Sequence, residues 1–567
     1  MKKRYLLGGA LALLAIGGGY ALWPEDEGPR PDLDLASAPI ADPATLRPDA
    51  LPNMPAVNTM AADGVNPMPH GEPAQQDSTL TPGPMDVSRQ LSDDEMSYVW
   101  LGPGYFGAYT SGLYPDGSRV LWANGVNGIY KIDYESYEVL SHSASPEAEE
   151  YTREWSEDIT AALDDDNSIW SLYTAITALK PLASLSGVYA VVGANGWFYI
   201  ARKDGSIEAY GDAVEGDPSS DIVRKATFQL PPAEAGPSVG MNMTYDGWIV
   251  FPTEDGTLVA VAPDLSEHRS IELTREEGED TSSQGLGYGW VRNSIALDED
   301  GGIYVASRNH MHKVMWNGED FSTDTADGAW TAEYRNGGGQ GTGATPSLMG
   351  FGEEDRFVVI TDGDPRMNVT LFWRDAIPEE WEQLPGAPSR RIAGIAPANM
   401  GELDVNKIQS EQTVIVAGYG ALVVNNRPRN IPFWYPEDGF NLGTLIGPLG
   451  SNPDFQPYGV QKFRWNPDLQ RIEQAWVNET ISSPNGVPWV SLGSGQVYFV
   501  GARDNQWTLE AVDWFTGEPT FHYIMGGQKW NSGFSGPTID ENGRPFIGTQ
   551  WGRMRINAVG TGGPQPE

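Results

Sequence analysis

Cysteine is absent from the 567-residue sequence, and histidine occurs only 6 times. The absence of cysteine excludes disulfide bonds, thiolate metal sites, iron–sulfur clusters, thioether haem attachment and cysteine nucleophiles. A metal ion bound by this chain must therefore be held by oxygen or imidazole ligands. Because imidazoles are so few, a hard cation such as calcium suits the available ligands better than zinc does.

Positive charge is also scarce. The chain has 36 lysine and arginine residues against 77 aspartate and glutamate residues, which gives a formal net charge of -41. A nucleic acid would be repelled by such a chain unless the basic residues clustered, and no cluster occurs beyond the first few residues. We therefore expect no nucleic-acid partner. The acidic excess is typical of the solvated surface of an exported protein or of a protein from a salt-tolerant organism.

Residues 1–23 carry the pattern of an export signal. Lys2, Lys3 and Arg4 precede an apolar run from Tyr5 to Trp23. That run is about as long as a membrane span, and no clear small-x-small cleavage site ends it. We interpret residues 1–23 as a signal peptide or a retained signal anchor, which places the rest of the chain in the periplasm or cell envelope. The alternative, a buried N-terminal core helix, agrees less well with the flanking charges.

Residues 24–93 are rich in Pro, Ala and Asp and carry almost no aromatic residue. Such a segment buries too little apolar surface to offset the entropy of ordering it. The composition predicts a disordered tether here, and residues 563–567 are predicted to be a disordered tail.

Residues 94–562 repeat one pattern. A turn with an Asp-Gly or similar pair precedes a short β-rich run, and a second turn leads into an alternating strand. About eight such units follow one another at a spacing of roughly fifty residues, which is in the range of propeller blades. We predict an all-β fold, a β-propeller with eight blades or, alternatively, seven. A pair of β-sandwiches or a β-solenoid would also account for the turn spacing.

The ends of this region predict how the ring closes. The final unit has only two convincing strands, while Tyr98 to Tyr109 is β-rich and has no unit of its own. Joining the two would let N- and C-terminal strands close one blade. Two insertions interrupt the repeat. Residues 145–185 fit a helical excursion, and residues 430–471 look like a long loop over one face.

Two late segments carry a family resemblance. Residues 509–518 read Leu-Glu-Ala-Val-Asp-Trp-Phe-Thr-Gly-Glu, and residues 535–549 contain Asp-Glu-Asn-Gly followed by Phe-Ile-Gly-Thr. This pattern resembles the repeat of quinoprotein-dehydrogenase-like (PQQ-like) propellers, and Leu297 to Ala306 is also similar to blades of gluconolactonase-like propellers. The resemblance implies the superfamily fold. Many quinone-cofactor enzymes place a vicinal disulfide against the cofactor, so the lack of cysteine speaks against bound PQQ.

Polar side chains a few residues before the first strand of several units could converge on the propeller axis. They are Asn242, Asn293, Glu411, Asn485 and Asn531. Together they could form an axial ring that holds Ca²⁺, which takes oxygen ligands in flexible geometry. In the lactonase-like propellers such a metal polarises a carbonyl and its bound water. The alternative is that these side chains cap turns, as asparagine often does.

Two weaker candidates are a His310-x-His312 pair, interpreted as a surface pair, and the turn Asp362-Gly-Asp364 with Asn368. The function that we predict is binding of a small molecule, or of a periplasmic or membrane protein, at the axial channel or top face. The alternative is an enzyme of the same fold, either a calcium-dependent lactonase or hydrolase or a quinone-linked dehydrogenase.

Overall fold

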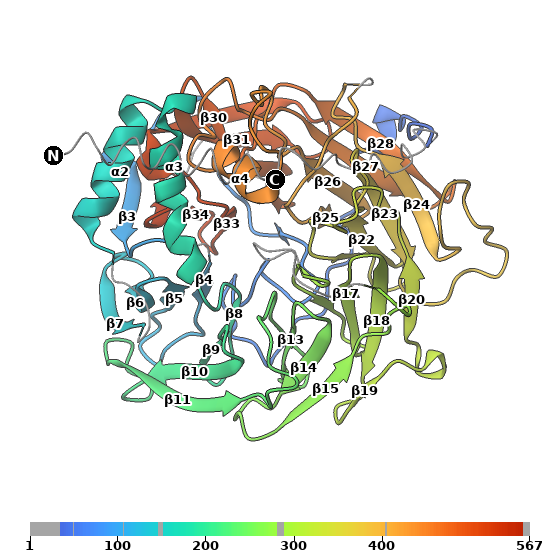
Figure 1. Cartoon of the computed structure of the whole chain (residues 1–567), viewed down its shortest axis with the longest axis horizontal. Helices are drawn as coiled ribbons and strands as arrows, with labels where there is room; N and C mark the ends of the chain where they lie inside the picture. The colour runs from blue at the N-terminus through green and yellow to red at the C-terminus, as the bar shows by residue number, and fades with distance from the viewer. Residues whose placement is uncertain are drawn as a thin grey trace.

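The computed structural model describes residues 35–48, 50–105, 107–145, 151–279, 289–402 and 405–558. Their strands form eight sheets, which stand around a central axis like the blades of a propeller (Figure 1). The β-propeller fold predicted from the sequence is confirmed. The predicted signal at residues 1–23 and the predicted tail at residues 563–567 lie outside the described residues.

Each sheet is built from four or more strands, most of which are consecutive and antiparallel, with the first strand of the unit on the axis side. Sheet 1 contains β4 (Ala108–Thr110), β5 (Val120–Gly125), β6 (Gly128–Asp133) and β7 (Val139–Ala144). Sheet 2 contains β8 (Ala190–Val192), β9 (Phe198–Ala201), β10 (Ser206–Asp212) and β11 (Ile222–Gln229). Sheet 3 contains β12 (Asn242–Met243), β13 (Ile249–Pro252), β14 (Thr257–Val261) and β15 (His268–Glu272). Sheet 4 contains β16 (Ala296–Leu297), β17 (Gly302–Ala306), β18 (His310–Trp316), β19 (Phe321–Ser322) and β20 (Trp330–Glu333).

The second half of the ring continues in the same way. Sheet 5 contains β21 (Ser347–Met349), β22 (Phe357–Thr361), β23 (Asn368–Trp373) and β24 (Ile392–Pro397). Sheet 6 contains β25 (Ile415–Ala417), β26 (Gly420–Val424), β27 (Val460–Asn466) and β28 (Arg471–Asn478). Sheet 7 contains β29 (Trp489–Ser491), β30 (Gln496–Arg503), β31 (Gln506–Asp513) and β32 (Pro519–Gly526), with β1 (Ser78–Thr79) and β2 (Arg89–Gln90) added at its two edges. Sheet 8 contains β33 (Pro537–Ile539), β34 (Pro545–Thr549), β35 (Gly552–Ile556) and β3 (Met96–Trp100).

The core lies between neighbouring sheets. Both faces of a blade are covered, so a central strand such as β22 is buried at every residue and reads as a continuous β-rich run. Aromatic rings fill the wedges between sheets. The Phe357 and Trp465 ring centroids are 4.7 Å apart, and those of Trp373 and Trp465 are 5.7 Å apart, which joins sheet 5 to sheet 6. Tilted and edge-to-face rings of this kind add to the hydrophobic stabilisation of the ring of sheets.

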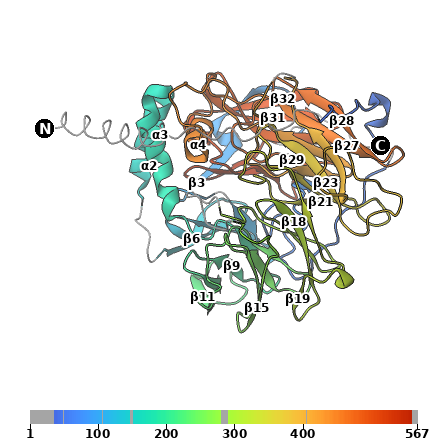
Figure 2. The same cartoon turned by 45° about the vertical axis from the view of Figure 1, so that its right-hand side comes forward.

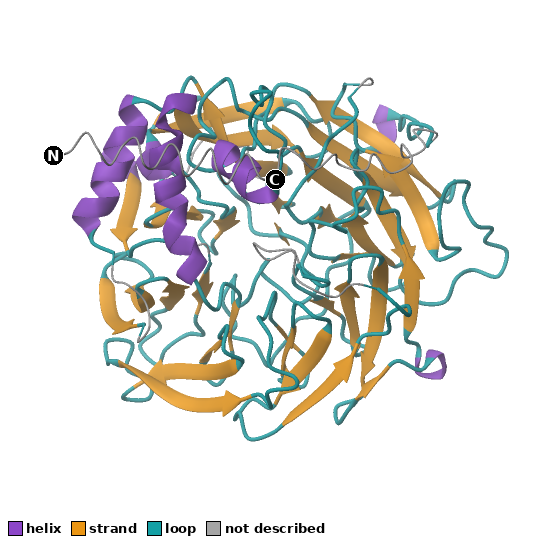
Figure 3. Cartoon of the chain, in the orientation of Figure 1, coloured by secondary structure: helices purple, strands orange, loops and turns teal. Residues whose placement is uncertain are grey.

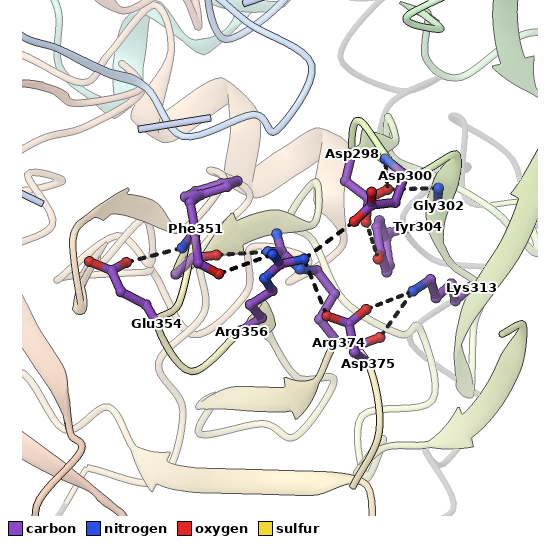
Figure 4. Close-up of polar contacts among 12 residues, drawn as sticks. Asp298, Asp300, Gly302, Tyr304, Lys313, Phe351, Glu354, Arg356, Arg374 and Asp375 are labelled. Carbon is purple, nitrogen blue, oxygen red and sulfur yellow. Dashed lines mark hydrogen bonds and ion pairs between the residues drawn. The ribbon is translucent and has the colours of Figure 1, made fainter. Parts of the chain in front are cut away.

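Ion pairs join sheets 4 and 5 in a similar way (Figure 4). The buried Lys313 on β18 places Nζ 3.0 Å from Oδ1 of Asp375, which follows β23. Arg356 places Nη1 3.3 Å from Asp300 Oδ2 and 3.6 Å from Asp375 Oδ2. Because Lys313 is buried, its carboxylate partner offsets part of the cost of removing its charge from water.

The ring closes by pairing the two ends of the propeller chain, as the sequence predicts. β3 runs antiparallel to β35, with Val99 opposite Arg553, and so supplies the outer strand of sheet 8. The rest of the predicted closing segment behaves differently, because β4 begins sheet 1 instead. One short stretch of sequence therefore belongs to the last sheet and starts the first.

The prediction of a disordered tether over residues 24–93 is wrong for the part that the structure describes. This N-terminal segment enters the propeller axis and donates or accepts backbone hydrogen bonds along the innermost strands. The N–H groups of Thr110, Val192, Leu297, Leu348, Val416 and Val490 donate to the carbonyls of Asn66, Pro67, Pro73, Ala74, Gln76 and Asp77 respectively. The innermost strand of a blade leaves backbone hydrogen-bonding groups unpaired on the side that faces the axis, and the N-terminal segment pairs with these groups.

Beyond the axis the N-terminal segment wraps sheet 7. β1 pairs in parallel with β29 at the inner edge, and β2 pairs in parallel with β32 at the outer edge. The segment then continues through the short 3₁₀ helix η2 (Asp93–Glu95) into β3. Composition alone misses this arrangement, because backbone pairing orders the segment together with a few buried side chains such as Met68.

A helical cap covers part of one face near the axis (Figures 2 and 3). It consists of α2 (Arg153–Asp165), α3 (Leu172–Leu179) and α4 (Gly439–Ile446), with η3 (Ile169–Ser171) and η4 (Lys180–Ser184) around α3. The helical excursion predicted within residues 145–185 is confirmed. The interpretation of residues 430–471 as one long loop is wrong in part, because the segment contains α4 and the strand β27. Three further 3₁₀ turns are η1 (Pro43–Thr45), η5 (Thr325–Asp327) and η6 (Gln528–Trp530).

Among the described residues, no helix has both the length and the apolar character needed to cross a membrane.

Candidate functional site

A cavity of about 430 Å³ lies on the propeller axis, and we call it the axial cavity. Residues on or just before the innermost strands of most sheets line it, and the N-terminal segment contributes the remainder. Its lining includes Tyr109, Tyr189, Asn293, Thr345, Thr413, Trp489, Ser535 and Arg553. Leu182, which lies in η4 of the helical cap, also reaches it.

The N-terminal segment forms the floor of the axial cavity. The lining residues Thr345, Thr413 and Val487 each stand three positions before the residues that bond the segment, Leu348, Val416 and Val490. Three residues of extended chain span about 10 Å, so the cavity and the bonded segment occupy successive levels of the axis. Asn66, Pro69, His70 and Asp77 line the cavity from this floor.

The floor carries a histidine–carboxylate pair. His70 Nδ1 lies 2.7 Å from Asp77 Oδ2, and the two side chains are 12% and 3% exposed. Gln75 ties the loop between them together, because its side-chain amide donates to the carbonyls of Pro69 at 2.9 Å and Glu72 at 2.8 Å. Glu72 Oε1 in turn accepts a hydrogen bond of 2.7 Å from the backbone of Gln76. The pair is therefore held on a tightly bonded loop.

The backbone of this loop is strained at the pair itself. His70, Gln75 and Asp77 have φ values of 58°, 61° and 55°, in the left-handed region that residues other than glycine seldom adopt. Such conformations persist only where the surrounding structure enforces them, and they gather at binding and active sites. Three such residues lie in the floor of the axial cavity, which makes this floor a candidate site.

Burial and the partner charge act in opposite directions on this pair. Burial opposes the positive charge of the His70 imidazole, but the carboxylate of Asp77 outweighs it and raises the pKa of His70 above its ordinary value. Burial raises the pKa of Asp77, and the nearby imidazole reduces that rise. Burial also raises the pKa of Glu72 to about 7, although backbone N–H groups of Gln76 and Ala74 counteract it.

Two residues that line the cavity carry hydrogen-bond donors. Arg553 is 2% exposed, and burial lowers the pKa of its guanidinium while the hydroxyls of Tyr137 and Tyr109 oppose that change. Trp489 is 4% exposed, and its indole N–H has no acceptor among the described residues. A buried donor without a protein acceptor is costly, so a site of this kind favours a ligand or water that accepts from it.

The predicted axial ring of calcium ligands is not assembled. Only Asn293 and Glu411 line the axial cavity. Glu411 contacts the guanidinium of Arg292, and Asn293 Nδ2 donates to the carbonyl of Thr342 at 2.8 Å. Both side chains therefore have protein partners, which agrees with the alternative that they fix loops.

The other three predicted ligands lie elsewhere. Asn242 donates to the carbonyl of Pro73 at 3.0 Å and so holds the N-terminal segment. Asn485 and Asn531 bond each other at 3.1 Å, and they donate to the carbonyls of Ile446 and Gly447 at the end of α4. Within the described ranges, no group of three or more histidine, aspartate or glutamate side chains could hold a metal ion.

The weaker candidates are structural. His312 is not a surface residue as expected, because it is 2% exposed and its Nε2 lies 2.8 Å from Ser307 Oγ. Burial lowers its pKa to about 3, so it stays neutral. Asp362 accepts from the backbone and side chain of Asn368 at 2.9 and 2.6 Å, which confirms the interpretation as a turn.

Sequence reasoning missed the histidine–carboxylate pair because it lies inside the supposed tether. The available signal was His70 followed by Gly71 and Glu72, with Asp77 five residues further on, in a stretch otherwise poor in titratable groups. A lone histidine in a Pro-rich segment gains meaning only when the segment is known to enter the axis.

The chain is 34% identical over 453 residues to an uncharacterized protein of Archaeoglobus fulgidus, and the match covers 78% of each chain. The chain belongs to the family of that archaeal protein. No protein-family model matches the sequence. At this identity and coverage the two chains share their fold, so the propeller described here is a property of the family.

Solved structures are similar in overall arrangement. The chain is 12% identical to quinohemoprotein alcohol dehydrogenase ADHIIG of Pseudomonas putida HK5, with a TM-score of 0.48 over 90% of this chain and 85% of that one. The corresponding enzyme of Comamonas testosteroni is also 12% identical, with a TM-score of 0.47 over 93% and 84%. The propeller fold of this chain rests on its own eight sheets and on the pairing of β3 with β35 that closes them.

Proposed function

We propose that this protein binds a small organic molecule that carries an oxyanion, such as a carboxylate, in the axial cavity. The observation that carries the proposal is the cavity of about 430 Å³, which the N-terminal segment closes at one end. Binding sites for small molecules typically measure about 300–1,000 Å³ and combine apolar walls with a few polar groups. Tyr109, Tyr189 and Trp489 provide such walls.

An oxyanion is supported by hydrogen-bond donors among the lining residues. The planar guanidinium of Arg553 matches the geometry of a carboxylate and can donate two parallel hydrogen bonds to it. A bound anion would also offset the cost that burial places on this charge. The indole N–H of Trp489 and the hydroxyl groups of Thr345 and Ser535, which also line the cavity, would complete the donor set.

The cofactors implied by the resemblance are not part of this proposal. The five side chains predicted to hold Ca²⁺ are dispersed and bonded to protein groups, so these residues do not fit a calcium site. The chain also lacks the cysteines that many quinone-cofactor enzymes place against PQQ. Neither Ca²⁺ nor PQQ therefore has a role in the proposed function.

Export to the cell envelope is a second part of the proposal. It is supported by Lys2, Lys3 and Arg4 ahead of the apolar run from Tyr5 to Trp23. Fusing residues 1–34 to a reporter enzyme that is active only outside the cytoplasm should give activity. A reporter that stays inactive, while a proven signal activates it, would contradict export.

Filling the axial cavity tests the binding proposal. Val188 lines the cavity and is 41% exposed, so Val188→Trp would occupy the space without removing a core side chain. Val214→Trp is the matched control, because Val214 is 59% exposed and does not line the cavity. Protein isolated gently from its natural host should retain a molecule of a few hundred daltons in native mass spectrometry, and Val188→Trp should lose it.

A second measurement uses defined anions. Benzoate and citrate at concentrations well above their dissociation constants should raise the melting temperature of the wild type and of Val214→Trp, because a ligand bound only by the folded state stabilises it. Val188→Trp should show no such rise. The proposal would be overturned if each anion changed the melting temperatures of the two variants equally and no bound molecule copurified with the wild type.

A further inference from the structure

The imidazole of His70 in the axial cavity is positioned to accept a proton. His70 lines the cavity, and Asp77 engages its Nδ1 at 2.7 Å. A carboxylate that accepts from Nδ1–H fixes the imidazole tautomer and leaves the lone pair on Nε2. No hydrogen bond to Nε2 occurs within the part of the chain that the structure describes, so this nitrogen remains for a ligand or water.

The position of the imidazole is fixed by more than one contact. Asp77 is 3% exposed on its side chain, and its carbonyl accepts a 2.9 Å hydrogen bond from the backbone of Val490 on β29. The loop that leads back to His70 is held by Gln75 and Glu72 in a strained conformation. Nucleophilic and acid–base groups need such preorganisation, because a small displacement from the reacting atom lowers the rate strongly.

We propose that His70 is a general base in the axial cavity, that Asp77 is its positioning residue, and that the substrate is a small carboxylic ester. This inference rests on the proposed function, because the carboxylate that an ester releases is the oxyanion expected near Arg553. In the reaction, a water O–H bond breaks and its proton moves to His70 Nε2, while the water oxygen bonds to the acyl carbon and the π pair of the C=O bond moves to the carbonyl oxygen. That pair then re-forms the C=O bond as the C–O bond to the alcohol breaks, and the alcohol oxygen takes the proton back from Nε2.

Several titratable groups surround this base. Glu72 and Asp77 lie on its own loop. Tyr109, Tyr189 and Glu411 line the cavity on or just before innermost strands, and Arg553 lines it from β35. Only the neutral imidazole can accept a proton, so the rate should rise with pH through the pKa of His70 and then level off. Replacing Asp77 with asparagine removes the charge that raises this pKa, and the rise should move to lower pH.

The experiment measures hydrolysis of p-nitrophenyl acetate by the full-length chain. We expect His70→Asn to lower kcat/KM by about a hundredfold, within the usual range for loss of a general base. Asp77→Asn should lower the plateau by about tenfold and shift the midpoint of the pH profile downward. Asparagine is chosen because it tolerates the left-handed conformation at both positions better than other residues do.

A second histidine–carboxylate pair provides the matched control. His268 Nε2 lies 2.9 Å from Glu234 Oε2, and neither residue lines the axial cavity. His268→Gln should hydrolyse the ester at the wild-type rate. Equal rates for wild type and His70→Asn, or an unshifted pH profile in Asp77→Asn, would overturn the acid–base role.

Chemical labelling keeps the proposal testable if a variant folds poorly. Diethyl pyrocarbonate should modify His70 in the folded wild type, as peptide mapping would show, and benzoate should protect it. Absence of modification at His70 would overturn its access to the cavity. If benzoate raises the melting temperature but p-nitrophenyl acetate is not hydrolysed, the binding proposal stands and the general-base role of His70 is overturned. If benzoate has no effect on the melting temperature and the ester is not hydrolysed, the binding proposal fails as well.

Discussion

Truncation of Met68 to alanine tests whether the N-terminal segment belongs to the folded body. Met68 lies in the axial part of that segment and is 0% exposed, in a cluster with Tyr199, Met241 and Met243 of sheets 2 and 3. Met68→Ala removes three atoms beyond Cβ. At about 0.8 kcal/mol per buried methylene-sized group, the lost transfer free energy is about 2 kcal/mol. The cavity left behind raises the expected loss of unfolding free energy to about 3 kcal/mol.

Urea unfolding followed by tryptophan fluorescence measures this loss as a lower transition midpoint with an unchanged slope. The matched control is Met60→Ala, because Met60 belongs to the same segment but is 38% exposed. We expect the control to lose less than about 1 kcal/mol, since part of its side chain stays in water. Equally small losses in both variants would refute the packed segment and restore the detached tether that composition indicates.

Two further predictions concern closure and pH. Gly552→Ala should lower the unfolding free energy by more than about 2 kcal/mol, because the added Cβ would lie 2.0 Å from the carbonyl oxygen of Val99 in β3. The control is Gly443→Ala in α4, whose added Cβ meets nothing within 4 Å and should raise the unfolding free energy by about 1 kcal/mol. The closure would be contradicted if both changes were stabilising in the same urea assay. Burial raises the pKa of Glu72 from 4.5 to about 7, so the folded protein retains a proton there that the unfolded chain releases. Stability should therefore fall as pH rises from about 4.5 to about 7, and Glu72→Gln should flatten that fall in a series of melting curves; an unchanged slope would contradict the buried carboxyl.

The propeller could be predicted because its signals are local and repeated. Each unit needs a turn, such as Gly256 at a φ of 92° between β13 and β14, and strands apolar enough to be covered on both faces. The closing strand was recognisable because Tyr98 and its neighbours form a β-rich run without a unit of their own. Both features depend on short stretches of sequence, which a single chain displays directly.

The axial features could not be predicted in the same way. Whether Asn242, Asn293 and Asn485 converge depends on where each stands relative to its innermost strand. Asn242 begins β12, whereas Asn293 and Asn485 stand three and four residues before β16 and β29. The N-terminal segment could not be predicted from its composition because residues such as Pro73 and Ala74 accept hydrogen bonds through backbone carbonyl oxygens, which every residue type carries. The floor of the cavity, including His70, could therefore not be predicted either, because that segment forms it.

The N-terminal segment has two roles that depend on each other. The innermost strands leave open hydrogen-bonding edges at the axis, and the segment satisfies six of them through carbonyls from Asn66 to Asp77. These bonds fix the path of the chain so closely that His70 and Asp77 are retained in left-handed conformations, which an unsupported loop would relax. The same pairing that closes the axis at one end therefore supplies the rigidity that an acid–base pair requires at the floor of the cavity. Loss of a carbonyl contact far from His70 should consequently weaken both the stability of the propeller and the reactivity of the imidazole.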